Sequence, residues 1–205
     1  LICAPGLAHA GTRPDVAPRR GQWFLDPEFR HGSPAGTLCI SFRRTGPGGW
    51  DNWGSDKVSI GDLEGLTQQD LASEAHSVSF RLTRDGGTFV CKGSIDGDRG
   101  AGTYELILDP NFPAELKRRG IGAPTEAQHV RLVMANCGIA LIDELRAQGY
   151  EKPDLPTLVK LAEHGVNLDY VRGLQACGYR LGSLARLVKA RDHGVDPEFI
   201  RGLAD

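Results

Sequence analysis

The sequence predicts an α+β protein, in which an N-terminal antiparallel β sandwich or small barrel is followed by an array of α-helical hairpins. Two observations lead to this class. Residues 22–110 contain short runs of alternating apolar and polar residues, separated by glycine-rich turns, which is typical of antiparallel strands. From residue 125 onward the chain repeats itself every 29 residues, and residues 155–176 match residues 184–205 at ten of 22 positions without a gap. A helical unit of this size cannot bury its apolar face alone, so neighbouring copies are expected to stack.

The 29-residue repeat carries its own helix signals. Residue types that cap helix N-termini recur at equivalent positions: Thr125, Asp154 and Ser183. About eleven residues later stand residue types that adopt the left-handed conformation ending a helix: Asn136, Gly165 and Gly194. A second set of caps and of helix-ending glycines follows in the same register: Gly138, Asn167, Asp196, Gly149 and Gly178. Each unit is therefore predicted to be a helix, a tight corner and a second helix.

The chain divides into four predicted segments. Residues 1–21 form an extended N-terminal arm, 22–110 the antiparallel β domain, 111–124 a short helix and linker, and 125–205 three helical-hairpin repeats. Within the β domain, residues 45–54 (TGPGGWDNWG) are predicted to be a long polar loop between two strands. Asp85-Gly86-Gly87 is predicted to supply a positive-φ hairpin turn.

Composition excludes several classes of protein. Of the 205 residues, 40% are hydrophobic and 24% are charged, which is typical of a soluble globular chain with a real core. The formal net charge of −2, without a basic run, gives no reason to expect nucleic-acid binding. No apolar stretch approaches the roughly 20 residues that span a bilayer, so the chain is not expected to be membrane-spanning.

The N-terminal segment favours export. An apolar stretch ends in Ala8-His9-Ala10, which fits the small-x-small pattern of a signal-peptidase site. A flexible arm rich in alanine and glycine is the alternative interpretation. Residues 11–21 (GTRPDVAPRRG) have no apolar periodicity, so an ordered arm would need a partner to hold it. We therefore expect a periplasmic or secreted protein, peripheral to the membrane.

Two pairs of residues in the β domain are candidates for a special role. Cys39 and Cys91 lie in predicted strands, so they form either an inter-strand disulfide or two small buried hydrophobic sites. Trp50 and Trp53, with Asp51 and Asn52 between them, are candidates to anchor a protein partner or to stack on a sugar ring. They can equally fold back over one end of the sheet.

A search for catalytic and metal sites finds no convincing constellation. His164 and His193 recur in the last turn of a repeat helix, where an imidazolium interacts favourably with the helix dipole, so a structural role is expected. The Asp96–Gly102 turn lacks the ligand pattern of a calcium loop and the helix of a nucleotide-binding loop. We therefore predict no catalytic, cofactor-binding or metal-binding residues. A hydrolase would need a spatially assembled cluster, for which His76 is the first residue to test.

A family resemblance supports this interpretation. The run 80–120 (FRLTRDGGTFVCKGSIDGDRGAGTYELILDPNFPAELKRRG) and the later HGVDPEFIRGL resemble the C-terminal accessory region of BlaR-like bacterial membrane metallopeptidases. In that region a β domain with a glycine-rich hairpin precedes helical repeats, and the resemblance covers most of residues 23–205. The peptidase part of the family carries an HExxH zinc motif among membrane helices, and this sequence has neither. The resemblance therefore implies an extracytoplasmic accessory domain without the protease activity.

These observations favour a non-catalytic, extracytoplasmic interaction or scaffolding protein. Its expected partner is a larger protein assembly, namely a respiratory, photosynthetic or sensory complex of a bacterial membrane, in which it would be an accessory subunit. The alternative is a ligand-binding β module that holds a carbohydrate or lipid, with Trp50 and Trp53 at the mouth of the barrel. An apolar cavity inside the sheet would favour this alternative, and an interior filled with side chains would count against it.

Overall fold

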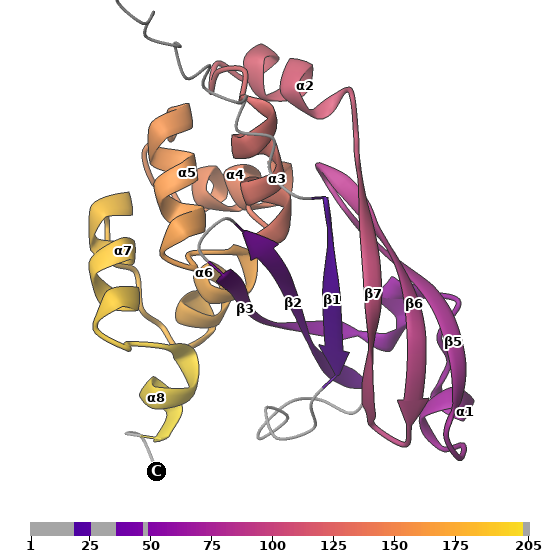
Figure 1. Cartoon of the computed structure of the whole chain (residues 1–205). Helices are drawn as coiled ribbons and strands as arrows, with labels where there is room; N and C mark the ends of the chain where they lie inside the picture. The colour runs from indigo at the N-terminus through magenta and orange to yellow at the C-terminus, as the bar shows by residue number, and fades with distance from the viewer. Residues whose placement is uncertain (1–18, 26–35, 47–48, 203–205) are drawn as a thin grey trace, which may run out of the picture.

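The computed structural model describes residues 19–25, 36–46 and 49–202. Within these residues the protein is an α+β structure, in which a nearly closed antiparallel barrel of seven strands is followed by a series of helices (Figure 1). The predicted fold class is confirmed. Most of the predicted N-terminal arm, residues 1–18, lies outside the described residues.

The strands form one antiparallel sheet in the order β3-β2-β1-β7-β6-β5-β4. Strand β1 pairs with β2 on one side and with β7 on the other, so the first strand joins two separate runs of consecutive hairpins. The strand bounds are β1 Arg20–Leu25, β2 Thr37–Gly46, β3 Gly49–Ser59, β4 Leu63–Glu64, β5 His76–Arg84, β6 Gly87–Asp96 and β7 Arg99–Leu108.

Large side chains fill the interior of the barrel. Phe42 of β2 stacks on Phe89 of β6 with ring centroids 4.1 Å apart, although β1 and β7 separate these strands in the sheet. The sheet must therefore curl to bring them together. Trp23 has no exposed surface and packs edge-on against Phe80 at 5.0 Å. Its indole needs Gly102 beside it, because a Cβ at that position would lie 2.7 Å from the Trp23 Nε1 atom.

The structure corrects two local predictions in the β domain. Residues 45–46 and 49–54, predicted to belong to a long loop, instead extend β2 and β3, with Phe42 opposite Trp53 and a β-bulge next to this pair. The glycine-rich composition of this segment is typical of a loop, although its described residues form two paired strands. The β5–β6 turn at Asp85-Gly86 does not use positive φ at Gly86 or Gly87. Both glycines are needed because a neighbouring segment approaches closely: a Cβ at Gly87 would lie 2.6 Å from the Ile107 carbonyl oxygen, and Gly86 faces α3.

The helices after the barrel repeat with the predicted period. The first helices of the pairs begin at residues 126, 155 and 184, and the second helices at 139, 168 and 197, so each pair starts 29 residues after the previous one. The helix bounds are α1 Gln68–Leu71, α2 Phe112–Arg118, α3 Glu126–Met134, α4 Ile139–Ala147, α5 Leu155–Glu163, α6 Leu168–Ala176, α7 Leu184–Asp192 and α8 Pro197–Gly202, with a 3-10 turn at Ile60–Asp62.

The predicted helix signals act as expected. The side chains of Thr125, Asp154 and Ser183 each accept a hydrogen bond from the backbone N–H three residues later. Left-handed backbone follows the first helix of each pair, with φ of 52°, 68° and 73° at Asn136, Gly165 and Gly194 respectively. These predictions are confirmed, because capping and helix termination depend on local chemistry.

Helix α3 joins the barrel to the helical array. Its residues Val130, Val133 and Met134 pack in the core of the barrel, whereas Leu132 of the same helix packs in the core of the array. The other helices of the array stack outward from α3, and α7 and α8 lie farthest from β5 (Figure 1). The two parts are therefore packed against each other through a shared helix.

Candidate functional site

Arg84 ties the barrel to the array through a nearly buried guanidinium group, whose side chain is 5% exposed. Its Nη1 atom donates to the carbonyl oxygens of Val133 and Met134, at 2.6 and 2.8 Å, where α3 ends. Its Nη2 atom forms an ion pair with Asp56 of β3. The guanidinium also lies over the ring of Phe89, 5.1 Å from its centroid. One side chain from β5 therefore fastens β3 and the C-terminal end of α3.

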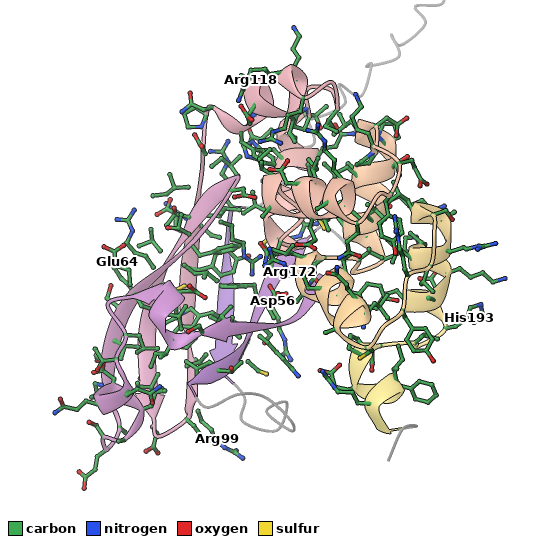
Figure 2. The ribbon with its side chains drawn as sticks, turned by 180° about the vertical axis from the view of Figure 1, so that it is seen from behind. Asp56, Glu64, Arg99, Arg118, Arg172 and His193 are labelled. Carbon is green, nitrogen blue, oxygen red and sulfur yellow. The ribbon has the colours of Figure 1, made fainter. Side chains whose placement is uncertain are left out.

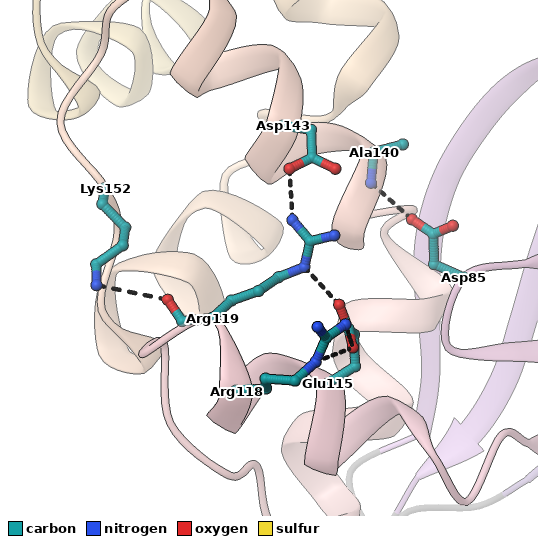
Figure 3. Close-up of polar contacts among 7 residues, drawn as sticks. All are labelled: Asp85, Glu115, Arg118, Arg119, Ala140, Asp143 and Lys152. Carbon is teal, nitrogen blue, oxygen red and sulfur yellow. Dashed lines mark hydrogen bonds and ion pairs between the residues drawn. The ribbon is translucent and has the colours of Figure 1, made fainter.

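The turn after Arg84 docks against the array. The Asp85 carboxylate accepts the backbone N–H of Ala140 at 2.8 Å, at the start of α4 (Figure 3). In the next repeat the Asn167 side chain caps the equivalent helix, whereas the first repeat has Gly138 at that position. A Cβ on Gly138 would lie 2.6 Å from the Asp85 Oδ2 atom. The first repeat therefore lacks its own cap because the barrel supplies one.

His129 of α3 makes a third contact between the barrel and the array. We call the contacts of Arg84, Asp85 and His129 the junction. The His129 Nε2 atom lies 2.7 Å from the Gly86 carbonyl oxygen, and the His129 ring stacks on Phe112 with centroids 4.8 Å apart. Burial lowers the pKa of His129, so the neutral ring donates to the carbonyl. Gly86 has no room for a side chain, because a Cβ would lie 2.7 Å from the Val133 Cγ2 atom.

The linker helix is held by an ionic contact of its own. Arg119 bridges Glu115 of α2 and Asp143 of α4, with 2.7 Å between its Nε atom and the Glu115 Oε1 atom (Figure 3). The hydrogen bonds that Arg118 and Arg119 donate to the Glu115 carboxylate lower its pKa. This pairing fixes α2 against the first repeat.

A cleft of about 470 Å³ lies between the barrel and the helical array. Strand β3 forms one wall and helices α6 and α8 form the other, and Asp56 lies between the strands and the helices in Figure 2. An ion pair between Lys57 of β3 and Glu198 of α8, at 2.8 Å, spans the two walls. The charged lining residues are Asp56, Lys57, Asp62, Asp169, Arg191, Glu198 and Arg201.

The surroundings of Asp169 in the cleft raise the pKa of its carboxyl group. It remains exposed to solvent, but the surrounding protein removes enough water to raise its pKa, and the nearby charge of Asp56 raises it further. Among the described lining residues there is no histidine or cysteine, and the Ser59 hydroxyl accepts the Gly61 N–H at 3.2 Å. This lining offers charge and hydrogen bonds to a polar surface.

The tryptophan prediction remains open. Trp50, Asp51, Asn52 and Trp53 lie on β3, and their side chains are outside the described part of the structure. Their predicted role in binding a partner is therefore neither supported nor contradicted.

Of the two alternatives for Cys39 and Cys91, the structure has two buried sites and no disulfide between them. Cys91 is a buried free thiol, and burial raises its pKa to about 12. It lies two residues from Phe89, which stacks on Phe42 in the barrel interior. Cys39 is three residues from Phe42 on β2 and therefore points to the opposite face of the sheet. Side chains alternate between the two faces of a strand, so the Cys39 and Cys91 side chains lie on opposite faces of the sheet and do not form a disulfide in this fold.

The predicted histidines occupy structural positions. His164 contacts Asp192 of the next repeat, with 2.6 Å between Nδ1 and Oδ1, and His193 ends α7. Both ring nitrogens of His76 have hydrogen-bond partners, the Glu74 carbonyl at 2.8 Å and the Asp70 carboxylate at 3.2 Å. Within the described ranges no group of three or more His, Cys, Asp or Glu side chains is placed to hold a metal ion.

Comparisons with protein-family models, curated proteins and solved structures found no significant match to this chain. The resemblance to BlaR-like accessory regions therefore stays a prediction from the sequence. In the part of the chain that the structure describes, no helix has both the length and the apolar character needed to cross a membrane.

Sequence reasoning missed the junction and the cleft. Arg84 and Asp85 are neighbours in the chain, but the helices that they contact and His129 lie more than 40 residues later, and only this meeting gives them a role. One signal was present in the sequence: the first repeat has Gly138 where later copies have Asn167 and Asp196. A missing cap indicates that another segment supplies the acceptor.

Proposed function

We propose that this protein is a non-catalytic interaction or scaffolding protein, which serves as an extracytoplasmic accessory subunit at the periphery of a bacterial membrane complex. The observation that carries the proposal is the charged cleft between the barrel and the array. Its walls come from both parts of the chain, and its lining supplies charges and hydrogen bonds suited to a protein surface.

The junction supports this function because it fixes the β3 wall of the cleft to the helical array. Arg84 connects Asp56, which lines the cleft, to the end of α3. The Lys57–Glu198 ion pair adds a second connection across the cleft. A pre-organised surface loses less conformational freedom when it binds, which favours affinity.

The location and the kind of partner rest on the sequence. The pattern at Ala8-His9-Ala10 and the resemblance to accessory regions of membrane metallopeptidases support an extracytoplasmic place beside a membrane complex.

The alternative ligand-binding module receives no support from the barrel. Trp23, Phe42, Phe80 and Phe89 are at most 1% exposed and pack against one another in its interior. The described interior is therefore filled with side chains where a carbohydrate or lipid would have to lie.

Native gel filtration after mild detergent extraction of membranes from the producing cells tests the proposal. We expect the protein to elute with a larger complex and Asp169→Lys to release it, because the substitution reverses a charge in the cleft. The matched control is Glu64→Lys, whose side chain is 80% exposed and lies away from the cleft on the barrel (Figure 2). A wild-type protein that elutes as a free monomer contradicts the proposal, as does release by both variants equally.

A further inference from the structure

One wall of the cleft is an edge of the sheet. Strand β3 comes first in the strand order, and among the described strands it pairs only with β2. The Ile60 N–H donates to the Gly36 carbonyl at 2.9 Å, which sets the hydrogen-bonding pattern of this hairpin. Bonded and non-bonded residues alternate in an antiparallel pair, so Val58 also bonds toward β2, whereas the backbone groups of Lys57 and Ser59 point away from it. Lys57 and Ser59 both line the cleft, so the outer edge of β3 borders it.

Three backbone groups on this edge are suited to pair with another strand. They are the N–H and carbonyl groups of Lys57 and the N–H of Ser59, which have no hydrogen-bond partner among the described residues. The Ser59 carbonyl does not count, because Ser59 is the N-cap of the 3-10 turn at Ile60–Asp62. Both residues are exposed. An uncovered strand edge of this kind is a template for an added strand.

The carboxylates of the cleft indicate which charge an added strand would carry. Asp169 lies on α6, in the wall opposite β3, and Asp62 follows β3. Neither carboxylate has an ion-pair partner in the part of the chain that the structure describes. Loss of solvent raises the pKa of Asp169, and the nearby charges of Asp56 and Asp62 raise it further. A cation beside Asp169 would relieve this repulsion.

The cations that line the cleft are engaged elsewhere. Lys57 and Arg201 both contact the Glu198 carboxylate, at 2.8 and 3.5 Å. The Arg191 guanidinium lies over the Tyr170 ring, 5.2 Å from its centroid. The acidic part of the cleft is therefore suited to a cation that a partner supplies.

The two arginines that act on Asp169 have closer partners. Arg84 forms its ion pair with Asp56, and Arg172 forms one with Glu144 at 2.7 Å. Their charges lower the pKa of Asp169 only in part, since it stays above its ordinary value. A basic side chain from outside would complement this carboxylate directly.

We propose that an extended segment of a partner protein adds to the outer edge of β3 as a further strand and places a lysine or arginine side chain beside Asp169. The segment accepts the N–H groups of Lys57 and Ser59 and donates an N–H to the Lys57 carbonyl. Edge pairing supplies affinity, and the basic side chain supplies specificity. This inference rests on the proposed function, which places a partner in the cleft, and it names the chemistry that the partner presents there.

Amide hydrogen exchange of the full chain, followed by NMR, tests the pairing with a defined probe. The probe is the peptide acetyl-TVKVT-amide, and the matched control is acetyl-TVEVT-amide, which differs only in the charge of its central residue. We expect millimolar lysine peptide to slow exchange of the Lys57 and Ser59 amides by about tenfold, because both become strand donors. The glutamate peptide should leave both amides fast. The Val58 amide, which bonds toward β2, is the internal reference.

Two substitutions separate the edge from the charge. Ser59→Pro removes one outward N–H at a backbone φ of −70°, which suits proline, and should abolish protection of the Lys57 amide. Ser59→Ala keeps the N–H and should retain the protection. In Asp169→Asn the two peptides should act alike, because the carboxylate that distinguishes them is gone.

Several results of this experiment would overturn the proposal. Equal protection by the two peptides in the wild type would show that charge plays no part, and no protection would show that the edge takes no strand. Protection of Lys57 that persists in Ser59→Pro would place the peptide elsewhere. Lys57 and Ser59 amides that already exchange slowly in the chain alone would show that this chain covers its own edge.

Gel filtration of the native membrane extract separates failure of this inference from failure of the proposed function. We expect Ser59→Pro to release the protein from the larger complex and Ser59→Ala to leave it bound. If the wild type and Ser59→Pro both elute with the complex, strand addition is wrong and the proposed function survives. If the wild type elutes alone, the proposed function fails and this inference fails with it.

Discussion

Substitution of Arg84 by methionine should strongly destabilise the protein, because Arg84 is the buried charge that joins the barrel to the array. Methionine retains much of the side-chain length but removes the two hydrogen bonds to the carbonyls of Val133 and Met134. It also leaves Asp56, whose side chain is 13% exposed, without its ion-pair partner. Removing one member of a buried pair costs about 3–5 kcal/mol. We expect a loss in that range, since little solvent screens either group.

Urea unfolding measures this loss with two signals. All three tryptophans of the sequence, Trp23, Trp50 and Trp53, belong to the barrel, so their fluorescence follows its unfolding. Circular dichroism at the helical minimum follows the array. The wild-type curves should coincide, because α3 contributes to both cores. In Arg84→Met they should separate, since the junction is weakened.

Two further variants make the reasoning refutable. The double variant Arg84→Met/Asp56→Asn should lose about 2 kcal/mol less than the sum of the single variants, because no buried charge remains unpaired. Arg81→Met, on the same strand but 52% exposed, should change stability by no more than about 0.5 kcal/mol. A loss below about 1 kcal/mol in Arg84→Met, or full additivity in the double variant, would show that the pair does not hold the junction.

Three other predictions follow from the junction and the repeats. Gly165→Val should lower stability by about 1–3 kcal/mol, because a β-branched residue resists φ of 68°; an unchanged melting temperature would contradict this reason. Gly138→Asn introduces the residue type of the second repeat but should lower the melting temperature, because its Cβ meets Asp85; a rise would contradict the docked turn. The pKa of His129 is lowered from its ordinary value of 6.5, so the unfolded chain binds its proton first and stability falls as pH drops below about 6.5. His129→Gln should make the urea midpoint less dependent on pH in that window, and an unchanged slope would assign the dependence to other groups.

Features that depend on neighbouring residues were predictable from the sequence. The 29-residue period, the caps at Thr125, Asp154 and Ser183, and the left-handed residue after each first helix are set within one turn of backbone. The alternating strands were predictable for the same reason, because side-chain period follows local geometry.

Features that depend on distant residues were not predictable. The segment with Trp50 and Trp53 has the composition of a loop, yet it pairs with β2 because the rest of that strand sets the register. Whether Cys39 and Cys91 meet depends on the faces of strands that are separated in the sheet. Phe199 and Tyr170 are equivalent aromatic positions of the repeat, and only the structure shows that Phe199 is exposed and Tyr170 is buried.

The sequence by itself therefore determined the fold class, the helix boundaries and the repeat, since backbone hydrogen bonding and capping act over a few residues. Tertiary structure alone decided that Arg84, Asp85 and His129 form a junction and that a charged cleft opens beside it. The physical reason is that burial, ion pairing and desolvation depend on which surfaces meet, and contacts between residues far apart in the chain leave no local pattern.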